Sequence, residues 1–207
     1  MKELPSRLLV ITDRHQARHS IAAIAEEVGH GGGRWLLLRD KDLKPRERRD
    51  LAARLAQIAR RHGMHLSVSR DVPLAAEYGA SVHLQSAAAI GAARQRLGPG
   101  ALVGVSAHSF NDVAAAAAAG ADYVTLSPIF LTASKPGYGP ALGVAAIGRA
   151  ADLGISVIAL GGVTTGLVRP CLDAGAAGVA VMGEIMRSDE PPRRIVGGFL
   201  TACQAAA

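Results

Sequence analysis

The sequence has few aromatic residues, few cysteines and no long hydrophobic run. Aromatic residues make up 3% of its 207 residues, although hydrophobic residues reach 49%. Alanine and small aliphatic side chains must therefore fill the interior, which favours helices packed on a sheet over an aromatic-rich β-sandwich. Charged residues make up 19%, which is typical of a globular chain rather than a disordered one, and residues 1–207 fit one domain.

The two cysteines, Cys171 and Cys203, are far apart and lack the spacing of a metal site. We interpret them as buried or incidental thiols of a reducing compartment. No window approaches 18 consecutive apolar residues, so we expect no membrane span. The apolar run that ends at Asp13 is too short for a signal peptide. Together these features predict a cytoplasmic protein.

The positive charges do not form a basic stripe interleaved with aromatic residues. The formal charge is +6, but the main basic run, at 44–50 and continuing to Arg60 and Arg61, follows one helical pattern and includes acids. We interpret this run as a solvated helix face, with a nucleic-acid patch as the alternative that we do not favour. A positive chain also favours a small anionic substrate.

Short apolar runs alternate with longer helical patterns along the chain. Most of the runs are apolar at successive positions, which is typical of strands covered on both faces. They cover residues 7–13, 34–40, 65–69, 81–84, 102–108, 123–129, 156–162 and 178–184. Eight β-α units in a chain of this length predict a (β/α)8 TIM barrel, with an open doubly wound sheet as the alternative.

In such a barrel the functional residues lie in the loops that follow the strands. Arg39 and Lys41 follow the second predicted strand, where both side chains can reach the barrel mouth. Gly161, Gly162 and Gly183 follow the last two strands, a common place for backbone N–H groups that bind phosphate. These glycines predict a phosphate site, the alternative being that they only form tight turns.

Residues 131–142 form an irregular loop after the sixth predicted strand. Thr132, Ser134 and Lys135 place two hydroxyls and one cation there without any acid. The loop therefore predicts a lid that closes over an anionic substrate, with Lys135 as a surface lysine in the alternative interpretation.

His108 lies at the end of the fifth predicted strand. An imidazole with its ordinary pKa near 6.5 can accept and return a proton at neutral pH, so His108 is a candidate catalytic residue. A structural or capping histidine is the alternative. His83 lies within a strand and is interpreted as a core residue.

These residues resemble the thiamine phosphate synthase/TenI family over nearly the whole chain. The matching segments are VITD (10–13), LRDK (38–41), GASVHL (79–84), GVSAH (104–108), ADYVTLSPIFLTASK (121–135), VIALGGV (157–163) and AGAAGVAVMGEI (174–185). The resemblance implies a (β/α)8 barrel and a role in thiamin biosynthesis around the thiazole phosphate. It also implies a small-molecule phosphate partner, and it leaves the oligomeric state open, with a homodimer as the candidate assembly.

The family has two chemistries, a magnesium-dependent synthase and a metal-free TenI-type tautomerase. The synthase joins hydroxymethylpyrimidine pyrophosphate to the thiazole phosphate and expels pyrophosphate. The roles that the resemblance implies by position are pyrophosphate binding for Arg39, Lys41 and Lys135, thiazole-phosphate contacts for Thr132, Ser134, Gly161 and Gly162, a pyrimidine contact for Ser106, and the tautomerase's catalytic histidine for His108.

The chain departs from the synthase pattern at three places. Leu37 stands in place of a glutamine, and Ser69-Arg70 (or Arg70-Asp71) in place of Asn-Asp. Residues 85–89 lack a further aspartate. Mg²⁺ prefers carboxylate ligands. The sequence loses one of the two expected carboxylates, and both if Ser69-Arg70 is the aligned pair, which favours a metal-free function without a cofactor, with Ser69 and Arg70 as substrate-binding residues.

We therefore expect a TenI-like thiazole tautomerase, an isomerase in which His108 moves the proton and Arg39 and Lys41 hold the substrate carboxylate. One alternative is a divergent synthase, a transferase with Mg²⁺ bound at Asp71. A second alternative is a non-catalytic binder of thiamin intermediates.

Overall fold

Eight parallel strands form a closed barrel in the computed structural model, which describes residues 2–131 and 140–205. The strands are β1 (Leu8–Ile11), β2 (Trp35–Leu38), β3 (His65–Ser69), β4 (Ser81–Leu84), β5 (Val103–Ala107), β6 (Tyr123–Leu126), β7 (Ser156–Leu160) and β8 (Gly178–Val181). They pair in chain order, and β8 closes the barrel on β1 through the pair Leu9–Ala180. The predicted TIM barrel is confirmed and the open sheet is wrong.

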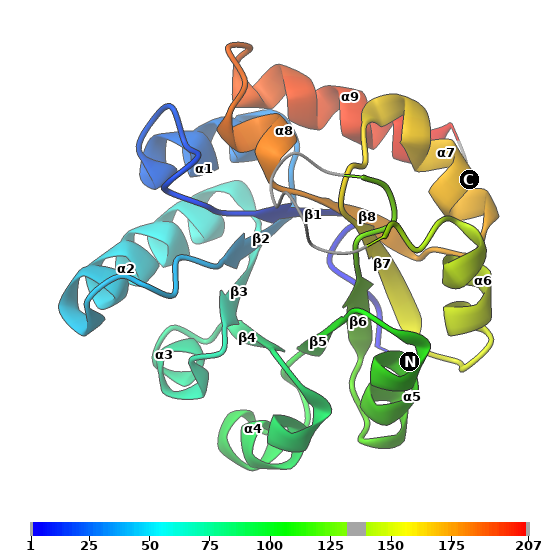
Figure 1. Ribbon diagram of the computed structural model, residues 1–207. Helices are drawn as coiled ribbons and strands as arrows, with labels where there is room; N and C mark the ends of the chain where they lie inside the picture. The colour runs from blue at the N-terminus through cyan, green and yellow to red at the C-terminus, as the bar shows by residue number, and fades with distance from the viewer. Residues whose placement is uncertain (1, 132–139, 206–207) are drawn as a thin grey trace.

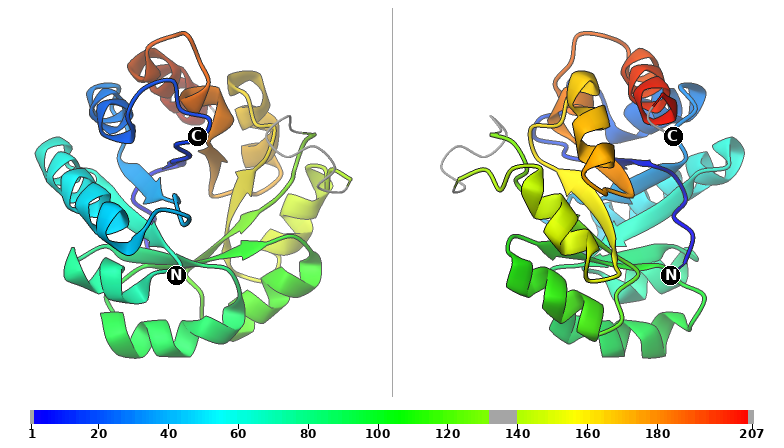
Figure 2. Two further views of the ribbon diagram at one scale, coloured as in Figure 1. Left: turned by 60° about the vertical axis from the view of Figure 1, so that its left-hand side comes forward. Right: turned by 90° about the vertical axis from the view of Figure 1, so that its right-hand side faces the viewer.

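Helices follow the strands and surround them, as Figure 1 shows. They are α1 (Ile21–His30), α2 (Pro45–His62), α3 (Val72–Glu77), α4 (Ile90–Leu97) after a 3₁₀ turn η1 (Ala87–Ala89), α5 (Phe110–Ala118), α6 (Ala145–Ala151), α7 (Thr165–Asp173), the short α8 (Gly183–Met186), and α9 (Pro192–Gln204). Helix α9 packs against α1 and α7 and completes the ring (Figure 2). No helix among the described residues is long and apolar enough to cross a membrane.

The strands are apolar at successive positions because both of their faces are buried. Leu8 and Val10 of β1 belong to the large cluster between the strands and the helices. Leu9 and Ile11 belong to a second cluster inside the barrel. Side chains on both faces of each strand are therefore buried away from water, which explains the unbroken apolar runs in the sequence.

Two large rings fill the barrel interior. Trp35 and Tyr123 are fully buried and meet edge to face, with ring centroids 4.9 Å apart. The Trp35 indole N–H donates to Ser67 Oγ at 3.0 Å. Gly104 on β5 leaves the space that the Tyr123 ring occupies, since a Cβ at residue 104 would lie 2.0 Å from Tyr123 Cζ. This packed interior makes the floor of the site at the carboxyl ends of the strands.

Candidate active site

A pocket of about 390 Å³ opens where the strands end. All eight strand ends contribute to its lining. Of the residues predicted from the sequence, those that line it are Arg39, Lys41, Ser69, Arg70, Ser106, His108, Gly161, Gly162 and Gly183. The structure thus brings these residues together, while the chemical role of each stays a prediction. Thr132, Ser134 and Lys135, with most of the predicted lid, lie outside the described residues.

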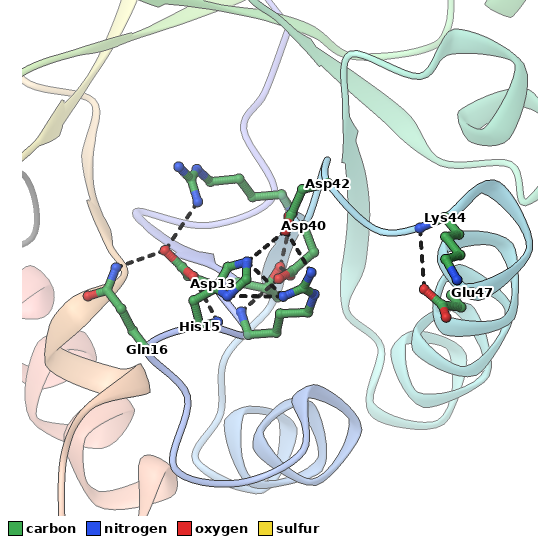
Figure 3. A network of polar contacts seen from close by, with 10 residues as sticks. Asp13, His15, Gln16, Asp40, Asp42, Lys44 and Glu47 are labelled. Carbon is green, nitrogen blue, oxygen red and sulfur yellow. Dashed lines mark hydrogen bonds and ion pairs between the residues drawn. The ribbon is translucent and has the colours of Figure 1, made fainter.

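The ends of β1 and β2 are joined by a buried polar network (Figure 3). Thr12 accepts a hydrogen bond from the Arg39 backbone N–H and donates one to Asp40 Oδ2, at 2.9 and 2.6 Å. Asp40 Oδ1 also accepts from the Arg14 N–H at 2.7 Å. The Arg39 guanidinium donates to Asp13 Oδ2 at 3.2 Å. This network fixes the direction in which Arg39 leaves the strand.

The turn after β3 places Arg70 on the pocket wall. Among the described residues, Arg70 is the one non-glycine residue with a positive φ, at 65°. The Asp71 N–H donates to the Ser69 carbonyl at 2.8 Å, so Arg70 lies at the centre of a three-residue turn. A left-handed conformation at a residue with a Cβ is strained and is commonly found at functional sites.

Four cations and one carboxylate are among the described residues of the pocket lining. The cations are Arg39, Lys41, Arg70 and Arg187, and the carboxylate is Glu184. The charge of Arg70, then burial and the charge of Arg39, lower the pKa of Lys41. Like charges therefore face one another across the β2 and β3 ends, an arrangement that favours a bound anion.

Asp71, the magnesium ligand of the synthase alternative, does not line the pocket. Its Oδ1 accepts from the Leu74 N–H at 3.0 Å and caps α3, and its Oδ2 lies 3.8 Å from Arg48 Nη1. Among the described residues, no group of three or more histidine, cysteine or acidic side chains could hold a metal. At the ends of β2 and β3, the described lining residues therefore offer Mg²⁺ no carboxylate ligand.

The turn after β7 requires both of its glycines. Gly161 and Gly162 have φ values of 97° and 66°. A Cβ at Gly161 would lie 2.9 Å from Pro128 Cα, and one at Gly162 would lie 2.4 Å from the Leu131 carbonyl oxygen. The glycines thus let this turn approach the loop after β6 closely, which gives them a structural reason beside the predicted contact with phosphate.

His108 lies on the pocket rim beside the end of β6. Its Nδ1 is 2.9 Å from the Ser127 carbonyl oxygen, and its backbone N–H donates to Asp112 Oδ2 at 2.9 Å. A hydrogen bond from Nδ1 to the carbonyl leaves Nε2 as the acceptor nitrogen of a neutral imidazole. The first contact holds the imidazole ring at the rim, and the second holds the backbone that carries it.

Several lining residues were not predicted as site residues. His83 is 5% exposed yet lies at the pocket floor, with Nδ1 3.1 Å from the Tyr123 hydroxyl and Nε2 3.0 Å from Ser106 Oγ. Burial lowers the pKa of His83 to about 4, so it is neutral at pH 7. Arg187, which follows α8, had no sequence signal. The inward position of His83 at the carboxyl half of a strand could have indicated its place.

Comparisons with known proteins agree with one another over nearly the whole chain. The family model described as thiamine monophosphate synthase matches residues 8–185. A putative thiamine-phosphate synthase from Geobacter sulfurreducens is 37% identical, covering 94% of this chain and 93% of the relative. A thiamine-phosphate synthase from Chromobacterium violaceum is also 37% identical, over 86% of this chain and 88% of the relative.

Among solved structures, a thiamine phosphate pyrophosphorylase from Pyrococcus furiosus superposes with a TM-score of 0.83 at 24% identity, covering 96% of both chains. This likeness supports the fold. The names of the sequence relatives contradict the expected tautomerase, so that expectation is wrong. The departures from the synthase pattern at residues 37, 69–71 and 85–89 therefore did not justify that expectation.

Proposed function

The chain belongs to the thiamine monophosphate synthase/TenI family, and from this premise we propose that it is a transferase of the thiamine-phosphate-synthase type. Its substrates are hydroxymethylpyrimidine pyrophosphate and the thiazole phosphate. The methylene carbon of the pyrimidine forms a bond with the thiazole nitrogen. The bond from that carbon to the diphosphate oxygen breaks, and the electron pair leaves with pyrophosphate.

The observation that carries the proposal is the cation-rich wall at the ends of β2 and β3. Arg39, Lys41 and Arg70 line the pocket together, and no described carboxylate in the lining comes from either strand end. Cations placed where negative charge develops stabilise a departing anion. We assign the diphosphate of the pyrimidine substrate to this wall.

The second anion has a separate place on the opposite wall. Gly161 and Gly162 after β7 and Gly183 after β8 leave the main chain without side-chain obstruction, and Arg187 adds a cation. Backbone N–H groups and a guanidinium are suitable ligands for a phosphate monoester. We assign the thiazole phosphate to this wall, so that the two anions lie apart and the rings meet between them.

The pocket floor between these walls is suited to a planar ring. Leu37 and Leu160 provide apolar contacts, and Ser106 provides a hydroxyl whose direction is set by neutral His83. His108 stands above them at the rim. We assign the pyrimidine ring to this floor, where the ring and the attacking nitrogen are brought into reacting geometry.

The test is turnover with both substrates, with thiamine phosphate and pyrophosphate measured as products. We expect the two products in equal amounts, and neither when one substrate is omitted. An Arg39→Ala variant should lower kcat/KM by at least about tenfold, because it removes a charged ligand of the leaving group. Arg54, an exposed arginine on α2, provides the control variant Arg54→Ala, which should retain wild-type activity. Absence of product under all conditions, with the protein folded, would refute the proposal.

A further inference from the structure

Arg39, Lys41 and Arg70 form what we term the β2–β3 cation cluster. We propose that this cluster binds the diphosphate group directly, without a divalent cation, and that Arg70 supplies positive charge where a bound metal would otherwise do so. The inference rests on the proposed function, because it concerns the leaving group of that reaction. It makes Arg70 a substrate-binding residue whose place is set by the turn after β3.

The backbone of this turn is held from three sides. The Arg70 N–H donates to the His83 carbonyl at 2.9 Å, which ties the turn to the end of β4. The Ser69 carbonyl accepts from the Asp71 N–H at 2.8 Å and from Arg48 Nη2 at 2.5 Å. Such contacts can maintain a strained left-handed residue, and here they hold Arg70 in the pocket lining.

The carboxylate of the neighbouring residue, Asp71, is engaged in contacts outside the pocket. Asp71 caps α3 through Leu74 and lies beside Arg48, a buried arginine on α2. To bind a metal, the Asp71 carboxylate would have to give up its hydrogen bond to the Leu74 N–H and its contact with the Arg48 guanidinium. The turn therefore presents a cation to the pocket and keeps the acid outside it.

The other acids near the cluster are also engaged. Asp13 accepts from the Arg39 guanidinium, which leaves Arg39 with a partner of opposite charge. Asp42 lies 2.6 Å from both Arg14 Nη2 and His15 Nε2 (Figure 3). Asp42 raises the pKa of Lys41, but this effect is smaller than the lowering caused by Arg70 and the lowering caused by Arg39.

The net charge around Lys41 is therefore positive. It is complementary to a negatively charged ligand and not to a metal cation. A diphosphate carries several negative charges that guanidinium and ammonium groups can bind directly. A divalent cation placed between these three side chains would be repelled by each of them. The cluster is thus complementary to the free anion.

The experiment measures the binding of inorganic pyrophosphate by titration calorimetry, in buffer with EDTA and in buffer with Mg²⁺. We expect binding in EDTA, tightened less than about twofold by Mg²⁺. The variant Arg70→Gly suits the left-handed backbone and removes the charge, so it should fold at least as well and bind pyrophosphate about tenfold or more weakly in EDTA. Arg54→Ala lowers the net charge equally and should bind like the wild type.

Binding that appears only with Mg²⁺, or an Arg70→Gly variant that binds as tightly as Arg54→Ala, would overturn the inference. These outcomes are separable from failure of the proposed function. Turnover that requires Mg²⁺, with no pyrophosphate binding in EDTA, retains the transferase and rejects the metal-free cluster. Pyrophosphate binding in EDTA without turnover of the two substrates retains the cluster as a diphosphate site and rejects the transferase.

Discussion

At the scale of single residues, His83 both lines the pocket floor and makes protein stability depend on pH. Burial lowers its pKa to about 4, whereas an exposed imidazole titrates near 6.5. Between these values the unfolded chain binds a proton that the folded protein does not. The free energy of unfolding should therefore fall as the pH falls from about 6.5 towards 4, by about 3 kcal/mol for this residue. Burial also lowers the pKa of His65, which adds to the fall in the same direction.

Urea unfolding of the wild type and a His83→Gln variant between pH 4.5 and 7.5 measures this effect. Glutamine keeps a polar group near Ser106 and Tyr123 but does not titrate. The variant should show a shallower dependence on pH below 6.5, and above pH 7 the two curves should run parallel. Equal slopes over the acidic range would mean that His83 is not buried as a neutral base.

At the scale of elements, β5 and β6 depend on a glycine for their contact. A Cβ at Gly104 would lie 2.0 Å from Tyr123 Cζ, and Tyr123 is fully buried against Trp35. Gly104→Ala should lower the free energy of unfolding by about 1–3 kcal/mol or more, because the ring must shift in a packed interior. Thermal and urea unfolding measure the change.

A glycine in a helix provides the matched control. A Cβ at Gly197, within α9, would meet no atom within 4 Å. Gly197→Ala should therefore raise stability by about 0.5–1 kcal/mol through helix propensity. If Gly104→Ala raises stability as Gly197→Ala does, the packing assigned to residue 104 is incorrect.

The elements differ in how far the sequence could predict them. The barrel was predictable because strands buried on two faces require apolar residues at successive positions, and that requirement is visible in the chain. The place of Arg39 and Lys41 in the pocket lining was predictable because they end such a run. His83 was not, since an inward side chain looks alike in sequence whether it faces a packed interior or a pocket floor. The division of roles between Arg70 and Asp71 depends on one φ angle and on Arg48 from α2, which sequence spacing does not encode.

At the scale of the whole molecule, the question is whether anion binding comes from total charge or from local arrangement. The formal charge is +6, and removing either Arg70 or Arg54 leaves +5 (6 − 1 = 5). A field set by total charge would weaken equally in the two variants. Contacts made by the β2–β3 cation cluster would be lost only in the variant that lacks Arg70.

Salt separates these two contributions. Raising NaCl from about 0.1 to about 1 M shortens the screening length from about 10 to about 3 Å, so the long-range field is suppressed while direct contacts remain. Pyrophosphate affinity should fall in all three proteins, but the gap of about tenfold between Arg70→Gly and Arg54→Ala should persist at high salt, because direct ion–guanidinium contacts are shorter than the screening length. Calorimetric titrations at both salt concentrations, with EDTA present, give the comparison. Convergence of the two variants at high salt would assign the binding to the total charge of the barrel and leave Arg70 without a contact of its own.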